Sequence, residues 1–224
     1  MKLIIFDCDG TLIDSQHMIV EAMRAAFLAS GFPAPDRDHV LRHVGLSVAE
    51  AMTAMVPAAD AKAIARLSAE YRAAFNALRQ EARLAEPMFP GAREGLLALG
   101  ARDDVLLGIA TGKSRRGVDR MIEREGFSGL FATIMTADDA PSKPHPAMIL
   151  QAMEATGVGA AESVMVGDTS FDMLMARAAR VEAIGVSWGY HEAAELVEAG
   201  AAAVARDFPE LQTLLMPSRD DIAA

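Results

Sequence analysis

Six short apolar segments alternate with longer, helix-length segments along this chain of 224 residues, and this alternation constrains the fold more than any other feature. The apolar segments lack a regular alternation of polar and apolar side chains, which indicates strands buried on both faces of a parallel sheet. We therefore predict an α/β fold. The predicted strands are residues 3–6, 105–110, 133–136, 164–166, 183–186 and 202–204, and the predicted core helices are residues 91–99, 114–125, 145–156, 170–179, 191–198 and 208–215.

One region interrupts the alternation, because residues 14–86 contain helical patterns and no convincing strand. The longest helix predicted there runs from about residue 58 to residue 83. Its apolar residues recur at spacings of three and four, which is typical of one face of an amphipathic helix. The residues of this apolar stripe are Ile64, Leu67, Tyr71, Phe75 and Leu78.

The ends of this helical region predict how the chain is divided. Pro87 and the pair Pro90-Gly91 mark the return to the alternating pattern. We predict an α/β core made of residues 1–13 and 87–224, with a helical cap of residues 14–86 inserted after the first strand.

The composition excludes several classes of protein. A formal net charge of −10 and a pI near 4.9 argue against nucleic acid as a general partner. Cys8 is the only cysteine, so an internal disulfide and a multi-cysteine zinc site are excluded. The first apolar run ends at Asp7 and is too short for a signal peptide, and no segment approaches the roughly 18 apolar residues of a membrane span. We expect a cytoplasmic protein without a membrane partner.

Carboxylates follow two of the predicted strands at the point where each strand ends. Asp7 and Asp9 come directly after the first strand, and Asp168 and Asp172 follow the fourth. Ligands of open α/β sheets bind at the carboxyl ends of the strands, so these side chains are candidates for a functional site. Each also has an ordinary interpretation, because acidic residues often begin turns, and an isolated Asp168 is typical of a helix N-cap.

The second and third strands end in groups of complementary chemistry. Thr111 and Gly112 offer a hydroxyl and free backbone N–H groups at a helix start, which is a suitable cradle for phosphate. Lys143 lies beside Pro144, which restricts the backbone and also suits the first turn of a helix, so a solvated lysine is an alternative. The joint pattern at four strand ends is what favours a phosphoryl-transfer site.

These motifs resemble those of the haloacid dehalogenase-like hydrolase superfamily, over essentially the whole chain. The matching segments are Asp7 to Thr11, Thr111, Lys143, and Gly167-Asp168 with Asp172. The resemblance implies a Rossmann-like parallel sheet core with an inserted helical cap of the C1 type. The segment from Ser187 to Tyr190 is similar to phosphoglycolate phosphatase-type and pyrophosphatase-type members.

The resemblance implies a role for each catalytic residue. Asp7 would be the nucleophile that forms an aspartyl-phosphate, and Asp9 would be the general acid and base. Thr111 and Lys143 would hold phosphate oxygens. The neighbouring loop residues Gly10, Thr11 and Gly112 would line the phosphate-binding part of the site.

The same resemblance implies a magnesium site. Asp7, Asp168 and the backbone carbonyl of Asp9 would bind Mg²⁺, and Asp172 would be a further carboxylate in or just behind the ligand set. Oxygen ligands of this kind suit Mg²⁺. Four carboxylates against one lysine would repel a phosphate, because like charges about 4 Å apart repel by roughly 4 kcal/mol at an effective dielectric of 20. We therefore expect the metal to be required.

Asp9 also separates related chemistries. A carboxylate at this position can protonate an alcohol leaving group, which favours phosphate esters over haloacids as substrates. Mutases of the family share this aspartate, so a hexose-phosphate mutase similar to beta-phosphoglucomutase remains an alternative, as do a pyrophosphatase and a non-catalytic module that binds a phosphometabolite. Lys62, the only cap lysine, lies within the predicted long helix and does not suit a phosphonate-cleaving Schiff base.

The cap turn of residues 43–47 corresponds to the loop with which this family contacts the leaving group. Arg42, His43 and Gly45 are therefore candidates for substrate contact, although a solvated arginine and a helix-ending glycine explain them equally. Asp14 and Ser15 are expected to form a hinge and a helix N-cap. We predict a small phosphorylated metabolite as the substrate, with phosphoglycolate first, and a monomer or homodimer as the assembly.

Overall fold

A computed structural model describes residues 1–80 and 86–216, and its centre is a six-stranded parallel sheet. The strand order is β3-β2-β1-β4-β5-β6, which is the order of a Rossmann-type doubly wound sheet. All six predicted strands are present, so the α/β prediction is confirmed. The strands are β1 (Lys2–Phe6), β2 (Val105–Thr111), β3 (Phe131–Thr136), β4 (Ser163–Gly167), β5 (Glu182–Val186) and β6 (Ala203–Ala205).

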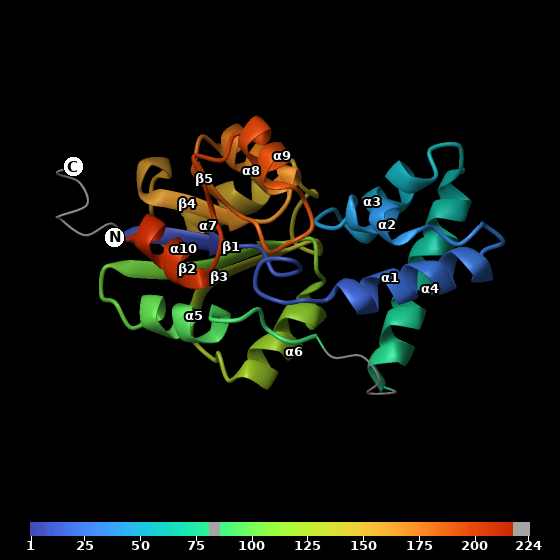
Figure 1. Cartoon of the computed structure of the whole chain (residues 1–224), viewed down its shortest axis with the longest axis horizontal. Helices are drawn as coiled ribbons and strands as arrows, with labels where there is room; N and C mark the ends of the chain where they lie inside the picture. Colours follow the sequence, from blue (N-terminus) through green and yellow to red (C-terminus); the bar gives the residue numbers. More distant parts are fainter. Residues whose placement is uncertain (81–85, 217–224) are drawn as a thin grey trace.

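Helices cover both faces of the sheet, as Figure 1 shows for α5 and α6 on one side and α7 and α8 on the other. Successive side chains of a strand point to opposite faces, so Ile4 and Phe6 pack into one apolar cluster and Leu3 and Ile5 into a second. The first cluster is completed by α5 (Ala92–Gly100), α6 (Arg115–Glu125) and α10 (Phe208–Leu215), and the second by α7 (Ala147–Thr156), α8 (Ser170–Ala179) and α9 (Ala193–Ala199). A 3₁₀ turn, Ala160–Glu162, precedes β4.

The segment between β1 and α5 forms a separate group of helices beside the carboxyl edge of the sheet (Figure 1). These helices have an apolar cluster of their own, to which Val40, Met52 and Leu67 contribute fully buried side chains. No strand occurs within residues 14–80. The helices of this cap are α1 (Gln16–Ala29), α2 (Arg37–Leu41), α3 (Val48–Met55) and α4 (Ala61–Gln80).

The longest predicted helix is confirmed as α4, but it begins later than the apolar pattern suggested. The carboxylate of Asp60 accepts a hydrogen bond from the backbone N–H of Ala63 at 2.8 Å, so Asp60 is the capping residue and the helix starts after it. Residues 81–83 of the prediction lie outside the described residues. Within the described helices, none is long and apolar enough to cross a bilayer.

The chain enters and leaves the cap at one place. The backbone N–H of Asp14 donates to the carbonyl of Pro87 at 2.9 Å, and Ile13 pairs with Met88 in an antiparallel bridge. The two connections therefore lie side by side, directly after the loop that carries Asp7 and Asp9.

Candidate active site

Lys143 lies at the centre of a buried group of charges at the carboxyl edge of the sheet. Its ammonium donates a 2.6 Å hydrogen bond to Asp172 Oδ1 and lies 2.9 Å from Asp7 Oδ2. The lysine side chain is fully buried. Burial alone lowers the pKa of Lys143, but the carboxylates of Asp172 and Asp7 more than reverse this and raise the pKa above its ordinary value. Lys143 is therefore a fixed positive charge.

Asp7 differs from its neighbours because, within the described residues, neither of its oxygens accepts a hydrogen bond of good geometry, although the Lys143 ammonium lies 2.9 Å from Oδ2. Burial raises the pKa of Asp7 to about 6, against the opposing effect of Lys143 and with a further increase from Asp172. A buried carboxylate whose oxygens accept no well-formed hydrogen bond is costly unless a ligand or an ion completes its contacts. Asp7 also lines a cavity between the core and the cap helices, with both of its oxygens buried in the wall.

Asp168 is held rigidly by core loops. Its Oδ1 accepts a hydrogen bond of 2.8 Å from the Thr11 hydroxyl, and its Oδ2 accepts one of 2.9 Å from the backbone N–H of Tyr190. A Cβ atom at Gly10 or Gly189 would lie 2.1 Å from an atom of this carboxylate side chain, so both positions require glycine. Asp168 does not cap α8, and the alternative interpretation of this residue is therefore wrong.

Oxygen atoms from Asp7, Asp168 and Asp172 lie within 4.8 Å of one another, and all three residues are buried. We call these three residues and Lys143 the carboxylate site. Burial, reinforced by the charges of Asp172 and Asp7, raises the pKa of Asp168 well above its ordinary value. Three clustered carboxylates with a single lysine fit a divalent cation with hard oxygen ligands. The free oxygens of Asp7 supply unpaired ligand atoms for it.

Asp172 has both oxygens engaged by the protein. Oδ1 accepts from Lys143, and Oδ2 accepts from the backbone N–H and the hydroxyl of Thr169 at 3.1 and 2.7 Å. This arrangement forms the N-terminal capping box of α8. Asp172 therefore fixes the ammonium of Lys143, which also lies 2.9 Å from Asp7 Oδ2.

The carboxylate of Asp9 points to a different set of partners. Its Oδ1 accepts hydrogen bonds of 2.7 Å from both the Ser15 hydroxyl and the Lys113 ammonium. Lys113 also donates to Glu86 at 3.0 Å. Burial alone lowers the pKa of Lys113, but the carboxylates of Asp9 and Glu86 raise it above its ordinary value. We call Asp9, Ser15, Glu86 and Lys113 the Lys113 network.

Sequence reasoning missed most of the Lys113 network. Ser15 occupies the N-cap position of α1, as expected, but its side chain makes no capping hydrogen bond and binds Asp9 instead. Lys113 follows Thr111-Gly112 directly, and a lysine so close to a strand end was a usable signal. Glu86 carries no comparable signal in the sequence, because it lies in the segment that returns from the cap to the core and not at a strand end.

A cavity of about 970 Å³ lies between the core and the cap, and it opens directly onto Asp7 and Asp9. Thr111 and Gly112 line it from the core, and His43 and Gly45 line it from the cap. Arg42 is exposed and does not line the cavity, so the structure does not bring this candidate to the site. The remaining predicted residues are buried and do not line the cavity, namely Gly10, Thr11, Lys143, Asp168 and Asp172.

The cap loop packs directly on the core. A Cβ atom at Gly112 would lie 2.6 Å from the carbonyl oxygens of Gly45 and Leu46, so glycine is required for this close approach. The backbone N–H of Ser47 donates a 2.7 Å hydrogen bond to the hydroxyl of Ser142, the residue before Lys143. The position of the cap is thus coupled to the loops that carry the site.

Cys8 lies between the two aspartates but is not available as a nucleophile. Its side chain is fully buried, and burial together with the charges of Asp7 and Asp9 raises the thiol pKa well above its ordinary value. The thiol therefore stays protonated and packs as a small apolar group.

Comparison with known proteins places this geometry in a family. A probable phosphatase, IndB, from Dickeya dadantii is 36% identical over 93% of this chain and 91% of its own length. A phosphoglycolate phosphatase from Photorhabdus laumondii is 29% identical over 97% of this chain and 94% of its own. The crystal structure of a hydrolase from Pseudomonas syringae superposes with a TM-score of 0.85 at 28% identity, covering 96% of this chain and 98% of that one. Residues 4–186 match the model of the haloacid dehalogenase-like hydrolase family, and this chain therefore belongs to that family.

Proposed function

We propose that this protein is a Mg²⁺-dependent phosphatase that hydrolyses small phosphate monoesters through a phosphoryl group carried on Asp7. The observation that supports this most strongly is the buried carboxylate of Asp7, which accepts no hydrogen bond of good geometry and lies 2.9 Å from a permanently charged lysine. A nucleophile needs free lone pairs, and the adjacent cation offsets the repulsion between this carboxylate and an incoming phosphate.

In the first step, an oxygen of Asp7 bonds to phosphorus as the bond from phosphorus to the ester oxygen breaks. Asp9 transfers a proton to the departing alkoxide, which leaves as the alcohol. Ser15 and Lys113 hold the Asp9 carboxylate at the cavity wall, two residues from the nucleophile. Lys143 and the hydroxyl of Thr111 stabilise the charge on the phosphoryl oxygens during transfer.

In the second step, water attacks phosphorus and the bond to Asp7 breaks, which releases phosphate and restores the nucleophile. Asp9, now deprotonated, takes the proton of the attacking water, so the same carboxylate serves as acid and then as base. Asp7 and Asp168, with the backbone carbonyl of Asp9, would hold Mg²⁺. Bound there, Mg²⁺ would offset the negative charge of the carboxylates and of the transferring phosphoryl group.

The insertion of the helical cap between β1 and α5 supports assignment to the C1-capped subfamily. A site beneath a cap favours a small phosphorylated metabolite over a protein or polymer. Phosphoglycolate is the first substrate to test, because several relatives carry that name. The contact of the cap loop with Gly112 supports a role for His43 and Gly45 beside the substrate.

The test is phosphate release from phosphoglycolate, other phosphate esters and pyrophosphate, with Mg²⁺ and with EDTA. We expect release with Mg²⁺ only. The variants Asp7→Asn and Asp9→Asn should each lose activity by a factor of about 10³ or more, because each removes a group that takes part in bond making or proton transfer.

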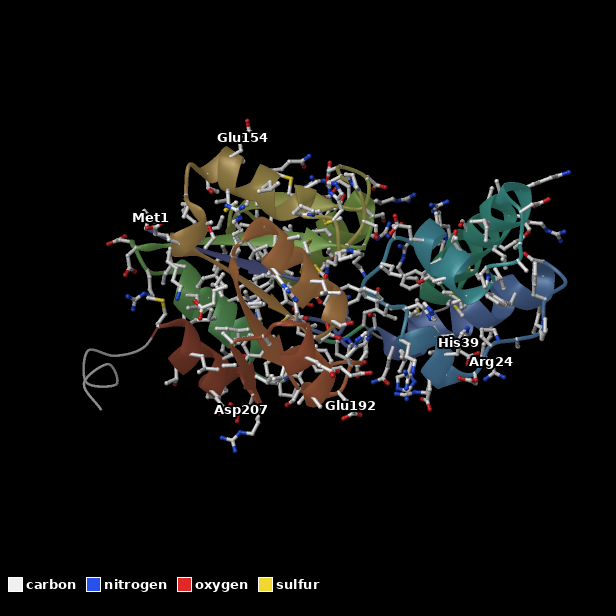
Figure 2. All side chains as sticks on the ribbon, turned by 90° about the horizontal axis from the view of Figure 1, so that it is seen from above. Met1, Arg24, His39, Glu154, Glu192 and Asp207 are labelled. Carbon is white, nitrogen blue, oxygen red and sulfur yellow. The ribbon has the colours of Figure 1, made fainter. Side chains whose placement is uncertain are left out.

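Arg24→Gln is the matched control for both variants, because Arg24 is an exposed residue of the cap surface (Figure 2) and does not line the cavity. It should retain full activity. Conversion of one hexose phosphate into another without phosphate release would indicate the mutase instead. Inactivity toward every substrate of the panel in folded, Mg²⁺-loaded protein would contradict an enzymatic function of either kind.

A further inference from the structure

The cavity extends well beyond the reacting end of the site. Tyr71 of α4 lies near Asp9, whose charge contributes to a raised pKa of the Tyr71 phenol after the larger effect of burial. Arg79 lines the same cavity eight residues later on α4, which is about 12 Å farther along the helix axis. A molecule as short as phosphoglycolate would leave this far end empty.

Arginines from two helices line the far end. Arg72 and Arg79 lie seven residues apart on α4, and Arg116 and Arg120 lie four apart on α6, so each pair shares one helix face. We call these four residues the arginine group. Its members take part in no ion pair within residues 1–80 and 86–216.

Arg79 and Arg120 are half-buried, whereas Arg72 and Arg116 are exposed at the mouth of the cavity. The Nη1 atoms of Arg79 and Arg120 are buried and find no hydrogen-bond acceptor among the described residues. Burial lowers the pKa of Arg120, and the neighbouring charges of Arg79 and Arg116 lower it further, against smaller opposing effects of Glu86 and Asp119. Arg79 and Arg120 therefore each keep one buried donor without an acceptor beside like charges, and an anion bound between them would relieve both conditions.

The local sequence disfavours this arrangement unless it serves a ligand. Arg116 lies in the first turn of α6, where the helix dipole disfavours a cation. Arg116 and Arg120 are also a like-charge pair at a spacing of four, which destabilises a helix. Violations of local rules are expected at functional sites, where binding offsets their cost.

The carboxylates in the same wall do not serve as partners. Glu86 is engaged by Lys113, Glu125 pairs with Arg93 and Arg124, and Asp138 accepts from the backbone N–H of Arg115. Glu123 is exposed on α6, three residues after Arg120. None of the four accepts a hydrogen bond from the arginine group in the described structure.

We propose that the arginine group binds a second anionic group of the substrate, a carboxylate or a phosphate, several bonds away from the phosphoryl group that is transferred. This inference rests on the proposed phosphatase function and narrows its substrate class to extended phosphate esters with an acidic tail. Such esters should be turned over more efficiently than phosphoglycolate, whose carboxylate is too close to phosphorus to reach Arg79 and Arg120.

The test uses pairs of esters that differ only in the charge of the tail. 6-Phosphogluconate and sorbitol 6-phosphate are open chains that end in a carboxylate and a hydroxymethyl group, and fructose 1,6-bisphosphate and fructose 6-phosphate form the corresponding pair for phosphate. In at least one pair, wild-type kcat/KM should favour the acidic tail by about tenfold or more, as a charge-assisted contact allows.

The variants Arg79→Gln and Arg120→Gln should each bring this ratio toward one, mainly through KM, and added salt should weaken the preference in wild type. Arg24→Gln removes a charge from the cap surface and should leave the ratio unchanged. Comparison of the two ester pairs shows whether the arginine group prefers a carboxylate or a phosphate.

Hydrolysis without a charge preference in either pair, or a preference that survives both variants, would overturn the inference and leave the phosphatase proposal intact. The absence of phosphate release from all four esters and from p-nitrophenyl phosphate would instead contradict the proposed function itself. The neutral-tailed esters therefore separate the two failures.

Discussion

The two lysines of the site lie in contrasting environments. Lys143 is fully buried between Asp7 and Asp172, and all three residues belong to loops and helix starts of the core. Lys113 is partly accessible and lies between Asp9 and Glu86, with its ammonium 5.7 Å from the ring centre of Phe75 on the cap helix α4. The carboxylate site is therefore built by the core alone, whereas the Lys113 network connects the core to the cap.

This contrast suggests a division of roles, in which the carboxylate site carries out the reaction and the region around Lys113 selects the substrate. In the proposed mechanism, the core provides the nucleophile, a fixed cation and a set of metal ligands that do not depend on the cap. We infer that the cavity wall formed by Lys113, α4 and α6 selects the substrate, and that Lys113 orients Asp9. Changes in the first region should abolish the reaction, and changes in the second should alter its rate and substrate preference.

The largest effect is expected for Lys143→Met. Removing the only cation of the carboxylate site leaves buried carboxylates unpaired, which should cost about 3–5 kcal/mol of unfolding free energy and about 10³-fold in kcat. Urea unfolding and steady-state kinetics measure the two effects. A folded, active Lys143→Met protein would contradict the central place of this lysine. Adding Asp172→Asn should recover part of the stability and none of the activity.

The next largest effect is expected in the pH dependence of the unfolding free energy, which should arise from the carboxylate site and not from the Lys113 network. The pKa of Asp7 is about 6 in the folded protein, above its ordinary value of 3.8. Between those values the folded state keeps a proton that the unfolded chain has lost, so Asp7 contributes a fall of about 3 kcal/mol in unfolding free energy as pH rises, and Asp168 contributes in the same direction.

This fall belongs to the metal-free protein and should be measured by urea unfolding in EDTA from about pH 4 to pH 7. Asp7→Asn should show a smaller fall than wild type, and Mg²⁺ should restore stability to wild type near neutral pH. If the unfolding free energies of wild type and Asp7→Asn fell equally with pH, Asp7 would not be the group whose raised pKa causes the fall.

An intermediate effect is expected for Lys113→Met. Ser15 still donates to Asp9 in this variant, so the acid and base should be misoriented rather than lost, and kcat/KM should fall by about tenfold. Because the lysine is partly accessible, the loss of stability should be smaller than for Lys143→Met. Equal losses in the two variants would remove the distinction between the regions.

The smallest effect is expected for Gly112→Ala, which adds a methyl group where the cap loop contacts the core. That Cβ would lie 2.6 Å from the Gly45 and Leu46 carbonyl oxygens, so the cap must shift. KM should rise several-fold, while the unfolding free energy of the core stays close to that of wild type. Gly159→Ala is the control, because its Cβ would meet only the flexible Glu162 side chain. An unchanged KM would show that cap position does not affect binding.

The sequence was most informative about the carboxylate site, for a physical reason. Parallel strands all end at one edge of the sheet, so residues after β1, β2, β3 and β4 must converge, although they are far apart along the chain. The strands themselves could be predicted because their apolar segments are continuous and well bounded. The convergence of Asp7, Lys143 and Asp168 could therefore be predicted from the joint pattern at the strand ends, whereas their roles came from the family resemblance.

The cap-facing wall could not be predicted in the same way. Its geometry depends on how α4 docks against α6, and a helical pattern does not specify which neighbour a face meets. Tyr71 and Phe75 belong to the predicted apolar stripe of α4, yet they also line the cavity. Arg42 was a candidate by its position beside the cap turn, but the orientation of that turn leaves it exposed. Arg79 carried no signal beyond that of an ordinary charged helix residue.

The phosphoryl group that we expect Asp7 to carry provides the most direct test. Wild-type protein should be mixed with Mg²⁺ and a hydrolysed ester, quenched in acid during turnover, digested and examined by mass spectrometry. The account predicts that the peptide containing Asp7 gains the mass of one phosphoryl group, and that the gain is absent in Asp7→Asn and in EDTA. Phosphate release by Asp7→Asn at the wild-type rate, with no modified peptide in wild type, would contradict it.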